Sequence, residues 1–176
     1  MEDRDSELVG RAARNDPQAL HALVDEHAQS LFAIANSMLR SPAEAEDIVQ
    51  DTFLACFIGL KRFEGRSSVR TWLVSILLRQ ISEKRRRDQR RPKVAWDQAE
   101  AQPAKNEPAT DAKLDLAAAL ATLSDDHRQV LTLREYGGLS YDQIAATLGL
   151  PRGTVESRLH RARQELAQRL KSYIEP

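Results

Sequence analysis

Apolar residues recur along most of the chain at intervals of three and four positions, which is the period of an amphipathic α-helix. The three longest apolar stripes are Leu20, Leu23, Val24, His27, Leu31, Ile34, Ala35 and Met38; Ile48, Val49, Thr52, Phe53, Cys56, Phe57 and Leu60; and Val69, Trp72, Leu73, Ile76, Leu77 and Ile81. A shorter stripe predicts a helix over residues 8–15. No stretch alternates as a half-buried strand would. The pattern therefore predicts an all-α fold.

Residues that favour helix starts precede the three long stripes. Asp16 and Ser41 can each cap a helix, and a proline follows each of them at a position suited to the first turn. Glu44 stands three residues after Ser41, at the spacing of a capping box. Ser67 or Ser68 can cap the helix that carries the third stripe. We therefore expect three main helices in the first half of the chain.

The composition changes between residues 92 and 112, where prolines, alanines and polar residues follow no period. We interpret 92–112 as a flexible linker between two small helical domains, residues 1–91 and 113–176. Trp96 is the exception in this linker, and we expect it to anchor in a groove of a neighbouring domain or partner. In the second domain, Ser124 caps one of the helices of a predicted four-helix unit.

The best-defined motif of the chain is a predicted helix-turn-helix over residues 139–166. Ser140 and Gln143 have the spacing of a capping box. Gly149 stands where the first helix needs a residue that tolerates positive φ, and Pro151 stands where a second helix can start. The buried stripe of that second helix is predicted to be Val155, Leu159, Ala162, Leu166 and Leu170.

The opposite face of the second helix is polar and mostly basic, and carries Arg152, Glu156, Ser157, His160, Arg161 and Arg163. Such a face suits the major groove of DNA, where arginine binds guanine or phosphate and glutamate accepts from cytosine. The alternative is a helical hairpin with a solvated charged face, and charge alone favours that alternative. The capping box, the glycine and the proline together favour the helix-turn-helix.

The 26 basic and 26 acidic residues balance, but they are unevenly distributed. Residues 1–51 contain eleven acidic and four basic side chains, whereas residues 62–93 contain eleven basic and three acidic ones. This separation indicates two partners, with nucleic acid meeting the basic part. The acidic and polar residues that open the second long helix are Glu44, Glu46, Asp47, Gln50 and Asp51. They either complement the helix dipole or bind a basic partner, and the residues alone do not separate these two interpretations.

The basic block ends in a cluster of seven cations and one acid between Lys84 and Lys93. A solvated helix end would need fewer cations to complement its dipole, so contact with phosphates is the better interpretation. Phe63, in the loop before the third long helix, is unusual in a chain with 5% aromatic residues. It either plugs the core or stacks on an unpaired base.

Several classes of protein are disfavoured by what the chain contains. Cys56 is the single cysteine, so we expect neither an internal disulfide nor a cysteine-based metal site. We expect His27 to be a histidine at the edge of the core. Four scattered histidines and no glycine-rich phosphate loop argue against an enzyme, a metal site or a cofactor. We find no membrane-length apolar run and no signal peptide, and we expect a cytoplasmic protein.

Two blocks of the chain resemble bacterial sigma factors of the sigma-70 family, specifically the small extracytoplasmic-function group. The first block, residues 8–87, contains AEDIVQDTFLACF and RFEGRSSVRTWLVSIL; the second, residues 114–170, contains LREYGGLSYDQIAATLGLPRGTVESRLHRARQEL. That group keeps sigma regions 2 and 4. The resemblance implies a factor that binds core RNA polymerase and directs promoter-specific initiation. It also implies regulation by an anti-sigma factor.

The resemblance also implies roles for individual residues. Contact with the β′ clamp helices falls to Glu46, Asp47, Ile48, Val49, Gln50, Asp51 and Phe53, which favours docking for the acidic helix. Recognition and melting of the −10 element falls to Phe63, Arg66, Ser67, Ser68, Arg70, Trp72 and Arg79, and from the charge pattern to Lys84, Arg85, Arg86 and Arg87. The −35 element falls to Arg152, Thr154, Glu156, Ser157, Arg158, His160 and Arg161, in a domain that also meets the β flap.

Arg79 stands where the family commonly has asparagine, and Glu156 stands where a basic residue is common. Both departures put the promoter sequence in doubt, although not the class of function. A repressor or a response-regulator output domain would explain the helix-turn-helix but not the acidic helix, and it would bind duplex DNA by itself. A structural adaptor would not need its arginines for DNA.

Overall fold

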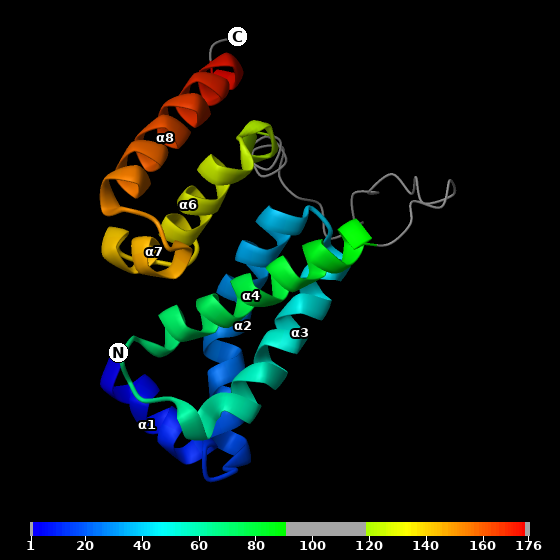
Figure 1. Cartoon of the computed structure of the whole chain (residues 1–176), viewed down its shortest axis with the longest axis vertical. Coiled ribbons are helices and arrows are strands. Elements are labelled where there is room, and N and C mark those ends of the chain that lie inside the picture. The colour runs from blue at the N-terminus through cyan, green and yellow to red at the C-terminus, as the bar shows by residue number, and fades with distance from the viewer. Residues whose placement is uncertain (1, 91–118, 175–176) are drawn as a thin grey trace. The chain divides into compact units, whose positions relative to one another are not determined.

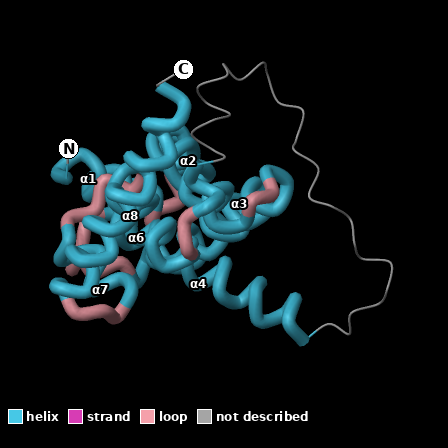
Figure 2. The backbone as a smooth tube through the Cα atoms, turned by 90° about the horizontal axis from the view of Figure 1, so that it is seen from above, coloured by secondary structure: helices cyan, strands magenta, loops and turns pink. Residues whose placement is uncertain are grey.

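The computed structural model describes residues 2–90 and 119–174, and none of these residues lies in a strand. The chain divides into two compact helical units, which confirms the all-α prediction (Figures 1 and 2). The first unit contains α1 (Glu2–Ala12), α2 (Pro17–Leu39), α3 (Pro42–Gly59), the short 3-10 helix η1 (Leu60–Arg62) and α4 (Val69–Arg90); the second contains α6 (Asp125–Glu135), α7 (Tyr141–Leu148) and α8 (Arg152–Ile174). The predicted linker bounds and Trp96 lie outside the described residues.

The first unit is a bundle in which α2, α3 and α4 contact one another and α1 lies against α2 and α4 (Figure 1). Its core consists mainly of the predicted stripes, including Leu23, Leu31, Ile34, Ile48, Phe53, Leu73, Leu77 and Ile81. Helix α1 starts several residues earlier than predicted and ends at Ala12, before Asn15 adopts a left-handed φ of 62°. The earlier start brings Asp5 onto the buried face of α1 together with Leu8 and Val9.

The predicted N-cap residues of the first unit accept the expected hydrogen bonds, whereas the Glu44 side chain binds Lys84 instead of serving the predicted capping box. Asp16 accepts backbone hydrogen bonds from Gln18 N at 2.9 Å and Ala19 N at 3.4 Å, and Ser41 accepts one from Glu44 N at 3.4 Å. Ser68 caps α4 by accepting from the amide of Thr71 at 3.2 Å. These bonds satisfy amide groups that the first turn of a helix leaves without partners. They therefore fix where α2, α3 and α4 begin.

His27 lies deeper than the core edge that the sequence predicted, because only 2% of its surface is exposed. Its Nε2 lies 3.9 Å from Asp5 Oδ2, and within the described residues neither ring nitrogen has a hydrogen-bond partner. Burial lowers the pKa of His27, while the nearby Asp5 carboxylate opposes that shift. No periodicity of the chain indicates this pair, since its members lie on different helices.

In the second unit, α6, α7 and α8 contact one another around a core that includes Val130, Leu133, Leu139, Ile144, Val155 and Leu159. Ser140 Oγ accepts from Gln143 N at 3.2 Å while Ser140 N donates to Gln143 Oε1 at 2.7 Å, which confirms the capping box. Gly149 ends α7 with a φ of 65°, a conformation that a side chain would strain. Helix α8 begins directly after Pro151, so the predicted helix-turn-helix is present.

Candidate polymerase and nucleic-acid interface

Helix α3 presents a row of acidic and polar side chains to solvent. Glu46, Asp47, Gln50 and Asp51 are exposed, and Ser41 with its following proline sets where their helix begins. Their spacing of three and four places them on one side of α3, opposite the side chains that the bundle buries. The predicted acidic docking residues Glu46, Asp47, Gln50 and Asp51 therefore form one continuous surface, the α3 face.

Three of the predicted polymerase contacts do not belong to the α3 face. The side chains of Ile48, Val49 and Phe53 are buried in the first unit, with exposed fractions of 2%, 9% and 6%. Their part of α3 turns toward α2 and α4, because the same apolar period that builds the core includes them. They can hold the α3 face in position, but they present no side chain to a partner.

Two side chains that were not predicted from the sequence extend the α3 face. Leu54 is 59% exposed and Ile58 is 84% exposed. Both follow Asp47 and Asp51 at helical spacing, so the exposed side of α3 changes from acidic to apolar along its length. A signal for both residues was present in the sequence, because Leu54 and Ile58 are large apolar side chains that fall outside the predicted buried stripe of this helix. They make the α3 face suited to a partner with both cations and apolar side chains.

A shallow pocket of about 280 Å³ lies beside the α3 face, between α3 and α4. Its lining is charged and consists of Glu44, Asp47, Ile48, Asp51, Lys84, Arg87 and Asp88. Lys84 Nζ lies 2.9 Å from Glu44 Oε1 and 3.4 Å from Asp88 Oδ2. The hydrogen bond that Lys84 donates to Glu44 raises the pKa of Lys84, which keeps this amine charged. Two of the acids are thus balanced within the unit, whereas Asp47 and Asp51 remain exposed.

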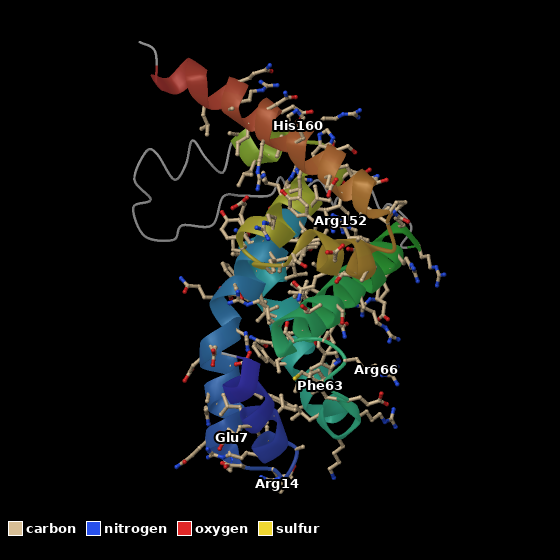
Figure 3. The ribbon with its side chains drawn as sticks, turned by 90° about the vertical axis from the view of Figure 1, so that its left-hand side faces the viewer. Glu7, Arg14, Phe63, Arg66, Arg152 and His160 are labelled. Atoms are coloured by element: carbon tan, nitrogen blue, oxygen red, sulfur yellow. The ribbon has the colours of Figure 1, made fainter. Side chains whose placement is uncertain are left out.

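The loop between η1 and α4 forms a second pocket, of about 270 Å³, lined by Arg62, Phe63, Glu64, Arg66, Ser67 and Trp72. The rings of Phe63 and Trp72 lie 4.7 Å apart between centroids and are tilted by 39°. Gly59 leaves room for this wall, because a Cβ there would lie 3.3 Å from the Trp72 ring. Figure 3 shows Phe63 and Arg66 on this loop. The pocket combines an aromatic wall with a cationic rim, the combination that binds an unstacked base.

The other residues predicted to meet the −10 element differ in their surroundings. Ser68 is the cap of α4, and Arg70 is half-buried and close enough to His27 to lower its pKa. Arg79 is exposed and donates through Nε to Glu83 Oε1 at 2.9 Å. Arg66 forms an ion pair with Glu64 at the mouth of the pocket. Of these side chains, only Arg66 lines the loop pocket.

The four consecutive cations at the end of α4 are not equivalent. Lys84 is held by Glu44 and Asp88, and Arg85 donates to the carbonyl oxygen of Met38 at 3.1 Å. Lys84 therefore joins α4 to the start of α3, and Arg85 joins α4 to the end of α2. Arg86 and Arg87 are exposed, as is Arg85, and Arg87 also lines the pocket beside the α3 face. The prediction that all four contact phosphates therefore fits Arg86 and Arg87 better than Lys84 and Arg85.

Helix α8 carries the second cationic surface, with Arg152 at its start and His160 about two turns later (Figure 3). Ser157, His160 and Arg161 are exposed, opposite the buried Val155 and Leu159. Ser157 also donates to the carbonyl oxygen of Thr154 at 3.0 Å. Helix α8 thus presents one polar face outward, in the manner expected of a recognition helix.

Carboxylates hold three of the arginines on α8. Arg158 lies 2.6 Å from Asp126 Oδ2 of α6, and Arg163 lies 3.0 Å from Glu135 Oε1 at the end of α6. Arg152 binds Glu156 and Asp142. Arg158 is only 25% exposed, so it joins α8 to α6 and fits the predicted DNA contact poorly. Thr154 is half-buried in the first turn.

Metal-binding groups and membrane-spanning helices are absent from residues 2–90 and 119–174. No group of three histidine, cysteine or acidic side chains there can hold a metal ion. No helix in those residues is both long and apolar enough to cross a membrane. Cys56 is buried, and its burial raises the pKa of the thiol to about 12, so it remains protonated at neutral pH.

Comparison with known proteins gives one consistent result. The profile of "Sigma-70 region 2" matches residues 23–91, and that of "Sigma-70, region 4" matches residues 113–166. The "ECF RNA polymerase sigma factor SigL" of Mycobacterium tuberculosis is 36% identical over 163 residues, covering 88% of this chain and 90% of that protein. The "RNA polymerase sigma-H factor" of Pseudomonas aeruginosa is 29% identical over 187 residues, covering 98% and 97%.

Two solved structures have a similar fold. CnrH in complex with the cytosolic domain of CnrY matches with a TM-score of 0.70 and 30% identity, covering 96% of this chain and 97% of that one. The sigma factor RpoE of Bartonella quintana, in complex with the anti-sigma factor NepR, matches with a TM-score of 0.70 and 31% identity, covering 85% and 97%.

Proposed function

Because this chain belongs to the extracytoplasmic-function group of the sigma-70 family, we propose which of its surfaces bind the polymerase and which bind the promoter. A sigma factor binds core RNA polymerase and directs transcription initiation at particular promoters. The first unit corresponds to sigma region 2 and the second to sigma region 4. Each proposed role below is assigned to side chains that are exposed or that line a pocket.

The α3 face is the surface that docks on core polymerase, through the β′ clamp helices. Glu46, Asp47, Gln50 and Asp51 supply acidic and polar groups for a basic partner. Leu54 and Ile58 supply an apolar end, which a partner would remove from water. An interface of this composition has an electrostatic part that salt screens and an apolar part that salt does not weaken.

The loop pocket receives a base of the −10 element after the duplex opens. The tilted rings of Phe63 and Trp72 offer a stacking wall, and Arg66 stands at the pocket mouth for the backbone phosphate. Removing a base from the stack costs a few kcal/mol, and stacking contributes about 1–3 kcal/mol per base. The pocket therefore offsets a large part of the cost of opening. Arg86 and Arg87 add phosphate contacts at the end of α4.

Helix α8 reads the −35 element in the major groove. Ser157, His160 and Arg161 are the exposed polar side chains best placed to reach base edges. Contact of this second unit with the β flap is part of the same proposal, and no side chain is assigned to it. Such a factor works where its polymerase is, in the cytoplasm.

An anti-sigma protein is the expected regulator. RpoE, which this chain resembles in fold, was solved with the anti-sigma factor NepR bound, and CnrH was solved with the cytosolic domain of CnrY bound. A basic and apolar inhibitor segment would compete with polymerase for the α3 face, because both partners need the same complementary chemistry.

The observation that supports this proposal best is the exposed row of acids on α3, because a protein that binds only DNA does not need an acidic surface. The test is in-vitro transcription with purified core polymerase on a library of randomised promoters. We expect the chain to select two separated elements and to start transcripts at a fixed distance from them. Transcription no more selective than that of core polymerase alone would contradict the proposal.

A further inference from the structure

The first turns of α8 contain a charged cluster that the proposed contacts of Ser157, His160 and Arg161 do not use. Arg152 Nε donates to Glu156 Oε1 at 2.9 Å, one turn further along α8. Arg152 Nη1 also lies 3.2 Å from each carboxylate oxygen of Asp142 on α7. Glu156 lies between Arg152 and His160 along the helix and is exposed. This arrangement joins the two helices of the helix-turn-helix.

The cluster has one cation and two carboxylates, so its formal charge is −1. The hydrogen bond to Glu156 and the nearby Asp142 carboxylate raise the pKa of Arg152. Arg152 is therefore shared between these two carboxylates, and a phosphate would have to compete with both of them. The cluster as a whole repels the DNA backbone. A hydrogen bond from a base to Glu156 would offset this repulsion.

The major groove offers few donors to a carboxylate. Only cytosine and adenine present an amino donor there, and acidic side chains typically bind the cytosine one, because the adenine amino group lies beside the N7 acceptor, which a carboxylate disfavours. Glu156 Oε1 is held by Arg152, which leaves Oε2 for such a donor. The N-terminal part of a recognition helix is the part that contacts base edges.

From this geometry we infer that Glu156 selects a cytosine within the −35 element, and that Arg152 is a positioning residue that holds its carboxylate toward the groove. The inference rests on the proposed role of α8 as recognition helix. Glutamate at position 156, where a basic residue is common, would then change promoter choice. Arg152 and Asp142 would help to hold Glu156 in position.

The test is selection of promoter sequences by the full chain with core polymerase, from a pool randomised over the −35 element. We expect wild type to enrich cytosine at one position by about fivefold or more, which is the lower end of what a good base contact contributes. Glu156→Ala should abolish that enrichment while the other positions keep theirs. Glu156→Gln should shift the enrichment toward adenine, because glutamine pairs with the adenine edge.

Glu165→Gln is the matched control, since it removes one negative charge from the same helix. Glu165 lies 3.0 Å from His127 of α6 and away from Glu156. It should leave the cytosine preference unchanged. Arg152→Ala should reduce that preference without replacing it by another base.

The outcomes separate the two levels of the account. The inference is supported if Glu156→Ala loses the base preference at one position and keeps it at the others. A wild-type pool with clear −35 selection that Glu156→Ala leaves unchanged at every position would overturn it while the proposed function stands. No −35 selection by wild type at all would contradict the proposed function itself.

Discussion

The end of α4 and the outer face of α8 are both rich in cations, yet the two regions use these charges differently. At the end of α4, Lys84 and Arg85 bind Glu44 and the carbonyl oxygen of Met38, so they stabilise their own bundle. On α8, the paired arginines bind carboxylates of α6 and α7, and their contacts hold the recognition helix in place. In both regions about half of the basic side chains belong to the fold.

A run of basic residues in the sequence therefore overstates the surface that is available to DNA. The acids that neutralise a cation lie far away in sequence, so a count along the chain does not reveal them. What remains differs in kind. Arg86 and Arg87 form a short exposed cluster suited to phosphates, whereas Ser157, His160 and Arg161 form a polar face suited to base edges. The first cluster should therefore affect affinity and the second should affect sequence preference.

An exposed arginine and a paired arginine of α8 should differ most when each is replaced by alanine. Arg161→Ala should weaken −35 recognition by about 1–3 kcal/mol if Arg161 binds a base through two bonds. Arg163→Ala should have a much smaller effect, because Arg163 already binds Glu135 at 3.0 Å and exposed pairs contribute about 0–1 kcal/mol. Binding of matched and mismatched −35 promoters by the reconstituted polymerase measures both. Equal effects would show that pairing does not decide which arginines read DNA.

A second experiment makes the same distinction at the end of α4. Arg86→Gln with Arg87→Gln should lower the slope of log affinity against log salt by about 1.8, because each phosphate contact contributes about 0.9. Lys84→Gln with Arg85→Gln should leave the slope unchanged and lower the melting temperature instead. Promoter binding at several salt concentrations and thermal unfolding give the two readouts. A slope that falls equally in both double variants would place all four cations on the DNA.

Local signals account for most of the fold that was predicted from the sequence. Asp16, Ser41, Ser140 and Gly149 act on groups within a few residues, so their effect on helix ends depends little on the rest of the chain. The register of the apolar stripes likewise follows from helical geometry. The early start of α1 was missed, because it depends on contact with α2.

The candidate sites were predicted less completely, for two physical reasons. A motif lists consecutive residues, whereas each residue of a helix turns about 100° from the last, so Ile48 and Phe53 face inward while Leu54 and Ile58 face outward. Long-range pairs such as Arg158 with Asp126 form only after the helices pack, and no periodicity encodes them. The aromatic wall of the loop pocket was foreseen only in part, because the sequence left Phe63 as either a core plug or a base contact.

The smallest expected effect concerns the buried His27, which lies among Asp5 of α1, Glu26 of α2 and Arg70 of α4. Burial lowers its pKa below the ordinary value of 6.5, so the unfolded chain takes up a proton before the folded one does. The free energy of unfolding therefore falls as the pH drops below about 6.5, by up to about 1.4 kcal/mol per pH unit.

His27→Leu removes the titrating group and should flatten this dependence. Urea unfolding of the full chain between about pH 7 and pH 5.5 measures it for both proteins. The exposed histidines His21 and His160 are common to both, so their contribution cancels. An identical pH slope in wild type and variant would mean that His27 is not buried in its neutral form. This outcome would leave the cationic surfaces unaffected.

The central claim is that the α3 face holds core polymerase independently of the surfaces that hold DNA. Equilibrium binding of the labelled chain to purified core polymerase, at modest salt and without promoter, tests it most directly. Asp47→Lys with Asp51→Lys should abolish binding while helical content and melting temperature are kept, and Arg86→Gln, outside the pocket beside the α3 face, should bind as wild type does. Undiminished affinity of the charge-reversed chain would contradict the account.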